Sequence, residues 1–335
     1  MKDRATIIKE LKSTKIKIDG HCHAGISLAS YRNFGYPYAI SFEDHVIRMR
    51  CFGMDRAVLF PFVESLYYVK DLNKSAIETT KQYCQFPYEL ENKNLLKEIY
   101  DIFPEYSDRA IPFLIFDPSR ETEKQALFFE ELYQQYPVFG LKTVTSYIQA
   151  YVTDLETVGA PILEFARSRD LPIIFHSAYY SKNPWASVYE LQKFAERNPD
   201  VRIVIAHSAK FVKSVLDRAN ELDNCFVDIS AFIIHCHLAA SNEEVIPDVI
   251  KRFAADYTDP FDVLFKLIEA YPTKIIWGSD SPYYYWIQKY FDSDGVLHDQ
   301  HLKCSYEDEI NLLKRLPQDY TDKICYENTI RFLFG

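Results

Sequence analysis

Two histidines, His21 and His23, stand two positions apart at the end of a short apolar run, Lys17-Ile18-Asp19-Gly20-His21-Cys22-His23. Side chains on a strand alternate between its two faces, so we expect both imidazoles to point the same way and Cys22 to point away. Two imidazoles that converge from one strand can hold a borderline metal ion. A surface loop with two unrelated histidines is the alternative.

Other residues that can do chemistry also follow apolar, β-rich runs. Because strand ends of a parallel barrel share one rim, where active sites form, we expect these side chains to gather at one place. They are Lys142 in Phe139–Lys142, His176 in Pro172–His176, His207 in Ile203–His207 and Asp280 in Ile275–Asp280.

Eight such runs alternate with amphipathic stretches along the chain, and their continuous apolar character suits parallel strands that are buried on both faces. This alternation predicts an α/β fold, a (β/α)8 TIM barrel, with a doubly wound open sheet as the weaker choice. The runs are Ile16–Asp19, Ala57–Pro61, Ile111–Phe116, Val138–Thr143, Pro172–Phe175, Arg202–Ala206, Cys225–Ile229 and Lys274–Trp277.

Amphipathic patterns predict the helices between and after these strands. Two connections, Phe62–Ala110 and Ala231–Thr273, are longer than one helix needs, so we expect helical insertions after strands 2 and 7. They form caps, lids or subunit contacts, or simply peripheral helices. The predicted helices are Phe42–Phe52 with a stop at Gly53, Glu121–Tyr136, Leu155–Ser168, Ala186–Arg197, Lys210–Leu222, Ser305–Leu316 and Asp319–Phe334.

Composition narrows the class of protein. Acidic residues outnumber basic ones, 48 against 38, and no basic block stands out, so a nucleic-acid partner is disfavoured. The N-terminus lacks the apolar core of a signal peptide, and no segment is apolar enough to span a bilayer. The seven cysteines are scattered without a Cys-x-x-Cys pair, which fits free thiols in a reducing cytoplasm. We expect one cytoplasmic domain over residues 1–335.

The order and spacing of these motifs resemble the amidohydrolase superfamily, and most closely its amidohydrolase-2 branch of metal-dependent TIM-barrel hydrolases and decarboxylases. The resemblance runs nearly end to end. It covers the first strand with its two histidines, the strands that precede His176 and His207, the stretch Trp277-Gly278-Ser279-Asp280-Ser281-Pro282, and the closing segment Tyr326–Gly335.

The resemblance implies a metal site and roles for the residues around it. His21, His23, His176 and Asp280 would bind one divalent metal ion, most readily Zn²⁺, with Mn²⁺ or Fe²⁺ as alternatives. Such an ion lowers the pKa of its bound water towards neutrality, and Asp280 could take the proton of that water. His207 would act as a base or an electrostatic partner. The alternative is a structural histidine whose ring is buried and hydrogen-bonded in the core.

Lys142 has three interpretations. In a mononuclear site it would offer its charge to a carboxylate or carbonyl of the substrate, which we favour. A carboxylated lysine that bridges two metals, as in binuclear relatives, and an outward-facing lysine are the alternatives.

Several departures and additions bear on the substrate. Ser208-Ala209 stands where many relatives carry glycine, so the substrate approaches differently. Arg32, Tyr179 and Tyr283 are candidate substrate contacts in aromatic segments near strand ends, although such rings also pack rims and interfaces. His235-Cys236-His237 repeats the first spacing after strand seven and is interpreted as a loop or substrate-side feature.

The sequence therefore predicts a metal-dependent hydrolase of a small-molecule amide, lactone or related carbonyl compound, acting through metal-activated water, in which Lys142 and His207 stabilise the oxyanion. A non-oxidative decarboxylase or hydratase on the same scaffold is the runner-up. A non-catalytic barrel that binds a ligand or partner protein is the alternative from another class. We expect a small-molecule substrate, no membrane or nucleic-acid partner, and a homo-oligomer such as a dimer.

Overall fold

The computed structural model describes residues 2–27, 39–70, 77–179, 183–284, 286–291 and 297–335. Arg32 lies outside the described residues. All seven cysteines are unpaired thiols. No helix in the described ranges is long and apolar enough to cross a membrane.

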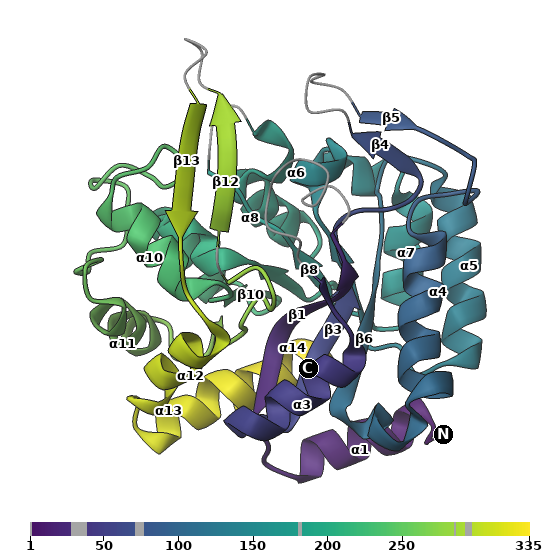
Figure 1. Ribbon diagram of the computed structural model, residues 1–335, viewed down its shortest axis with the longest axis horizontal. Helices are drawn as coiled ribbons and strands as arrows, with labels where there is room; N and C mark the ends of the chain where they lie inside the picture. The colour runs from purple at the N-terminus through teal and green to yellow at the C-terminus, as the bar shows by residue number, and fades with distance from the viewer. Residues whose placement is uncertain (1, 28–38, 71–76, 180–182, 285, 292–296) are drawn as a thin grey trace.

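Eight parallel strands form the centre of the molecule, one for each predicted apolar run (Figure 1). Neighbours along the chain pair in parallel, and the short strand β2 (Ala39–Ile40) adds to β1 in antiparallel orientation. The prediction of a barrel with this strand order is confirmed. The strands are β1 (Ile18–Ile26), β3 (Arg56–Pro61), β6 (Ala110–Ile115), β7 (Gly140–Thr143), β8 (Ile173–Phe175), β9 (Ile203–Ile205), β10 (Cys225–Asp228) and β11 (Ile275–Ile276).

The barrel closes between β1 and the segment that follows β11. The Gly20 N–H donates to the Trp277 carbonyl at 3.0 Å, and the Asp280 N–H donates to the His21 carbonyl at 2.9 Å. Beyond them the His23 N–H donates to the Ser281 carbonyl at 2.8 Å. Asp280 therefore lies past the end of its strand, in a segment that is hydrogen-bonded to β1.

Helices surround the strands and carry local signals that the sequence contains. Ser41 and Asp44 cap the start of α3 (Phe42–Phe52), and Gly53 ends it with a φ of 77°. The other helices are α1 (Arg4–Ser13), α4 (Glu89–Lys97), α5 (Thr122–Gln135), α6 (Thr145–Ile148), α7 (Ala160–Ser168), α8 (Val188–Arg197), α9 (Lys213–Glu221), α10 (Phe232–Ala240), α11 (Pro260–Ala270), α12 (Tyr306–Lys314), α13 (Gln318–Asp322) and α14 (Asn328–Phe334).

Two hairpins differ from the predicted helical pattern. The insertion after the second strand holds the hairpin of β4 (Tyr68–Lys70) and β5 (Ile77–Thr79) as well as α4, so it is only partly helical. A second hairpin, β12 (Trp286–Phe291) with β13 (Leu297–Leu302), follows the barrel. Both stand at the same end of the barrel in Figure 1, opposite α1 and α13. Each is a local pairing outside the strand–helix repeat, which is why the repeat alone did not predict it.

The predicted C-terminal helix is also interrupted. Between α13 and α14 the residues Lys323–Glu327 form a π-helical turn. Similarly, the predicted helix Leu155–Ser168 divides into a 3-10 turn, Val152–Glu156, and α7, which has a proline in its first turn. The insertion after the seventh strand contains α10 and α11, and residues 241–259 between them form no helix.

The strands separate two cores. Inward-facing residues such as Val58, Phe60 and Phe113 fill the barrel, and Leu11 of α1 and Leu333 of α14 close its amino-terminal end. Outward-facing side chains pack under the surrounding helices. The period of two along each strand thus decides which side chains line the barrel interior.

Candidate metal and substrate site

A bulge in β1 aims the two histidines of the first strand into the barrel. Asp19 pairs with Ala57 and Cys22 with Leu59, so three steps along β1 face two steps along β3. Ile18 belongs to the inner core, and the extra residue shifts the later alternation so that Cys22 packs in the outer core. His21 and His23 consequently both face the barrel interior. Bulges beside active sites often redirect side chains in this way.

His21, His23 and Asp280 meet at the carboxyl end of the barrel. The Oδ1 atom of Asp280 lies 3.3 Å from Nε2 of His21 and 3.4 Å from Nε2 of His23. The ligand-type atoms of all three residues lie within 4.8 Å of one another, and all three side chains are buried. Three of the four metal ligands expected from the sequence are therefore brought together.

The other ring nitrogens of both histidines are already engaged. His21 Nδ1 lies 2.7 Å from Oδ2 of Asp228, and His23 Nδ1 lies 3.1 Å from the Pro61 carbonyl. Both partners are acceptors, so the protons are assigned to Nδ1 and the lone pairs to Nε2. In the neutral rings each Nε2 lone pair faces an oxygen of Asp280. Burial opposes a charge on His21, but Asp228 and Asp280 raise its pKa above the ordinary value, so without a metal the Nε2 atom of His21 is the one that holds a proton towards Asp280.

The Nε2 atoms of the two histidines and the Oδ1 atom of Asp280 surround a position that suits a cation. Burial lowers the pKa of His23 to about 4, which keeps its ring neutral near pH 7. Burial opposes ionisation of Asp280, but the adjacent histidines, His21 above all, hold the pKa of that carboxyl well below its usual range. Two imidazole nitrogens and a carboxylate oxygen are a donor set that suits a divalent transition metal, so the residues fit the expected ion.

His176 lies beside His207, within hydrogen-bonding distance. The Nδ1 atom of His176 is 2.9 Å from Nε2 of His207. The Ser230 hydroxyl donates to Asp228 at 2.6 Å, so it accepts from Nδ1 of His207 at 2.9 Å. His207 Nε2 then accepts the Nδ1 proton of His176, which leaves the second nitrogen of His176 as a lone pair.

Lys142 points into the barrel, so the outward-facing alternative is wrong. Its Nζ atom lies 3.3 Å from Nε2 of His21 and 5.0 Å from the centre of the Phe60 ring, and the side chain is fully buried. Burial lowers the pKa of Lys142 to about 8, because the ammonium loses its water shell.

A left-handed turn follows β9 and carries two site residues. Residues 207–211 all have positive φ, between 47° and 60°, although none is glycine. Each such residue costs about 1–2 kcal/mol relative to the right-handed form. The turn holds His207 at its start and Lys210 near its end, and the Nζ atom of Lys210 lies 2.8 Å from Nε2 of His235.

Lys210, His235 and Asp228 are the residues that sequence reasoning did not place at the centre of the site. His235 lies on α10 and not in a loop, and its ring stacks on His207 with centroids 5.0 Å apart. Lys210 lies shortly after strand six and Asp228 is the last residue of strand seven; these positions were the available signal, since barrel sites gather at strand ends.

A cavity of about 580 Å³ is lined by two of the three converging residues, His23 and Asp280. Two predicted substrate contacts, Tyr179 and Tyr283, line it, together with Lys142, His176, His207, Lys210, His235 and Asp280. A cavity of this size accommodates a small molecule.

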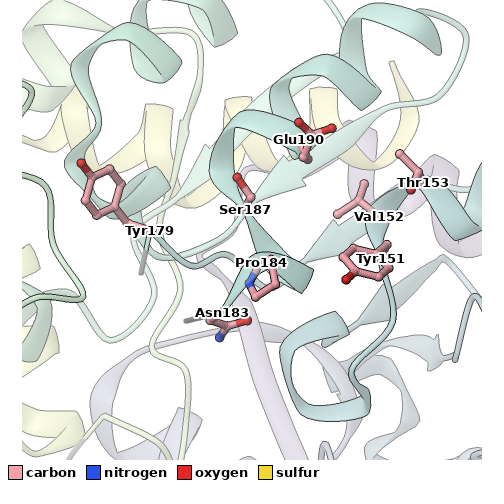
Figure 2. Close-up of a pocket in the computed structure, with 8 residues that line it drawn as sticks. All are labelled: Tyr151, Val152, Thr153, Tyr179, Asn183, Pro184, Ser187 and Glu190. Carbon is pink, nitrogen blue, oxygen red and sulfur yellow. The ribbon is translucent and has the colours of Figure 1, made fainter. Parts of the chain in front are cut away.

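A second cavity of about 440 Å³ shares Tyr179 and Asn183 with the first. Figure 2 shows Glu190 and Ser187 on one side of it and Tyr151 on another. Glu190 is the only charged residue among those that line it in the described part of the chain. Lys142 and Lys210 therefore distinguish the first cavity from the second, which has no lysine among its described lining residues.

Comparisons with known proteins bear on the family and on the fold. The sequence model of the amidohydrolase family matches residues 18–335. No curated protein sequence matches the chain.

Solved structures share the fold at low identity. An uncharacterised TIM-barrel protein from Bordetella bronchiseptica is 14% identical, with a TM-score of 0.58 over 95% of this chain and 98% of that one. A probable 2-pyrone-4,6-dicarboxylic acid hydrolase from Acinetobacter baumannii, with citric acid bound, is 12% identical, with a TM-score of 0.54 over 95% and 99%. The IDCase of Metarhizium anisopliae is 14% identical, with a TM-score of 0.53 over 96% and 97%.

Likeness at this identity establishes the fold, and the sequence match establishes the family. The match spans nearly the whole chain, includes His21, His23 and Asp280, and supports an enzyme over the non-catalytic barrel. The chain belongs to the amidohydrolase family and is an enzyme of the amidohydrolase type.

Proposed function

We propose that the protein is a metal-dependent hydrolase of a small-molecule amide, lactone or related carbonyl compound. The observation that carries the proposal is the convergence of the Nε2 atoms of His21 and His23 on one oxygen of Asp280, at 3.3 and 3.4 Å. A divalent ion bound there, with Zn²⁺ favoured and Mn²⁺ or Fe²⁺ as alternatives, supplies Lewis acidity and lowers the pKa of water.

The fourth proposed ligand is His176. Its Nδ1–H is directed to His207, so its Nε2 lone pair is available for an ion. This bond also orients the ring, which is the usual role of the second nitrogen of a ligating histidine.

Three side chains of the site then move the proton or stabilise the developing charge. Asp280, which its low pKa keeps ionised, is placed to accept a proton from the attacking water and to return it to the leaving group. His207, whose Nδ1 atom lies 3.9 Å from the second oxygen of Asp280, is proposed as an electrostatic partner that orients His176 beside the reaction centre. Lys142 donates to the carbonyl oxygen as negative charge develops on it.

Substrate contacts are proposed for the aromatic residues of the cavity and for Arg32. Tyr179 and Tyr283 supply flat apolar walls, and Tyr283 lies edge-on to His23 with ring centres 5.0 Å apart. Arg32 is retained as a proposed contact from the sequence alone. We further propose that the chain is one domain and forms a homo-oligomer. We also propose that it works in the cytoplasm, because a reducing compartment suits seven cysteines that are all unpaired thiols.

The test combines metal analysis with substrate turnover. The wild-type chain is expected to contain one divalent ion per chain and to lose hydrolysis of a panel of amides and lactones after chelation. His21→Ala is expected to lose both, because it removes an Nε2 donor. His237→Ala, on α10 and outside the residues that line the cavity, is the control and keeps both. A wild-type chain without stoichiometric metal, or a fully active His21→Ala variant, contradicts the proposal.

Decarboxylation is the second candidate, favoured by the buried amine of Lys142 at the cavity, which suits a carboxylated substrate. The two reactions differ in their products. Hydrolysis incorporates ¹⁸O from labelled water into the acid product, whereas decarboxylation releases carbon dioxide and leaves the organic product without ¹⁸O.

A further inference from the structure

Two buried lysine amines border the same cavity, and Asp228 and Asp280 act on both of them only from beyond ion-pair distance. Lys142 is fully buried and Lys210 is 8% exposed. Lys142 contacts His21 and the Phe60 ring, and Lys210 contacts His235. Neither forms an ion pair with a carboxylate among the residues that the structure describes. A buried ammonium without a counter-charge is costly, so buried charges in proteins are normally paired.

His235 fixes the direction of the Lys210 amine. The Nδ1 atom of His235 lies 2.8 Å from the Ala231 carbonyl, which can only accept, so this nitrogen carries the proton. Nε2 therefore accepts from Lys210 at 2.8 Å. The two other protons of the ammonium remain for a ligand.

The backbone holds Lys210 in place at a conformational cost. Lys210 has a φ of 53° within the left-handed turn at residues 207–211. The same turn places His207, whose ring stacks on His235, so the amine and the proposed reaction centre belong to one rigid unit. Strain of this kind persists where the surrounding structure maintains it, and it clusters at functional sites.

The surroundings of Lys210 indicate the shape of the ligand. Ile234 and Leu238 of α10, one residue before and three after His235, line the same cavity, as does Val245. Apolar walls with one oriented amine suit an apolar body that ends in a carboxylate.

We propose that Lys210, oriented by His235, binds a carboxylate of the substrate at a position separate from the reacting carbonyl. This inference deepens the proposed function and assigns its substrate class: an acid with an apolar body. Lys142, which lies beside His21, keeps its proposed role at the reacting carbonyl.

The test uses benzoate and its neutral counterpart benzamide as probes, titrated calorimetrically into the full chain as purified and after chelation. Benzoate is expected to bind in both forms and more tightly than benzamide. Lys210→Met is expected to weaken benzoate binding about 10- to 100-fold, the value of a charge-assisted hydrogen bond. Lys213→Met, in an exposed pair with Asp217 on α9, is the control and binds benzoate as the wild type does.

A second measurement needs no variant and covers the case in which Lys210→Met does not fold. Amine acylation of the wild type, read by peptide mass spectrometry, is expected to modify Lys210 less when benzoate is present than when benzamide is present. Unchanged acylation, undetectable benzoate binding, equal binding of benzamide, or a loss of binding in Lys142→Met but not in Lys210→Met overturns the proposal.

The two proposals fail separately. Metal content and the His21→Ala variant test the hydrolase, whereas the titration of the chelated chain involves no metal. A metal-dependent enzyme whose Lys210→Met variant binds benzoate normally retains the proposed function and loses this inference.

Discussion

Asp228 bridges the two halves of the site: its Oδ2 atom lies 2.7 Å from Nδ1 of His21, and its Oδ1 atom accepts the backbone N–H of His207 at 2.9 Å. One buried carboxylate thus orients a proposed metal ligand and, with Ser230, fixes the proton of His207. Burial would raise the pKa of Asp228, but His21 and the Ser230 hydroxyl hold it below its usual value.

Asp228→Ala is expected to weaken metal affinity about 10- to 100-fold, because partners behind metal ligands typically contribute that much. Competition with a metal-binding dye measures the change. Asp223→Ala, an exposed acid before the same strand, is the control. Unchanged affinity in Asp228→Ala would mean that the ring of His21 needs no orientation.

Gly278 allows β1 to approach the segment after β11. A Cβ atom on Gly278 would lie 2.6 Å from Cβ of His21, closer than real contacts permit. Gly278→Ala is therefore expected to displace His21 and reduce metal affinity and turnover at least about 10-fold. Gly53→Ala is the matched control. It has free space around it but a φ of 77°, so it should cost about 1–2 kcal/mol of stability and leave metal content unchanged. Equal turnover in both variants contradicts the expectation.

The left-handed turn predicts an unusual response to glycine. Ala209, with a φ of 47°, and Ala195 in α8 are both buried alanines. Both lose one methyl group on substitution, but Ala209→Gly relieves a strain of about 1–2 kcal/mol, whereas Ala195→Gly adds about 1 kcal/mol of helix cost. Urea unfolding should show Ala209→Gly to be more stable than Ala195→Gly by about 2–3 kcal/mol. Equal losses in the two variants would show that the turn is not strained.

Glu309 predicts a dependence of stability on pH. Burial raises the pKa of Glu309 from its ordinary 4.5 to about 8, and its Oε2 atom has no hydrogen-bond partner in the described structure. Between these values the folded chain retains a proton that the unfolded chain releases. The free energy of unfolding therefore falls as pH rises from about 4.5 to 8, by at most about 1.4 kcal/mol per unit.

Glu309→Gln is expected to remove this contribution, because the amide oxygen still accepts the Ile233 N–H and cannot ionise. Urea unfolding at pH 5.5, 7 and 8.5, at fixed metal content, measures the slope. Gln318→Glu, at an exposed position, is the control for a change of one charge. The same slope in Glu309→Gln and wild type contradicts the assignment.

The strand order and the convergence of His21, His23 and Asp280 were predictable because they depend on periodic patterns and on residues near strand ends. The bulge in β1 was not, since one extra residue between Asp19 and Cys22 leaves no mark in the apolar pattern. The expectation that His21 and His23 share a face was still correct, because both follow the shift.

The rest of the site depends on contacts between segments that are distant in the sequence. His235 was assigned to a loop or a substrate-side feature, and only the packing of α10 against the left-handed turn brings its ring to Lys210. The sequence gives no sign that Asp228 differs from an ordinary strand residue; its role depends on its contact with His21 of β1. The hairpins β4–β5 and β12–β13 were missed because a hydrophobic pattern specifies a strand poorly when its pairing is local.

The seam between β1 and the segment after β11 has a consequence for the timing of assembly. His21 and His23 lie on one side of this seam and Asp280 on the other, so the three groups come from nearly opposite ends of the chain. A growing chain that has not yet reached Asp280 has the two imidazoles without their carboxylate partner. Capture of an ion by all three residues accordingly follows completion of the barrel, and a bound metal would then resist separation of its first and last strands.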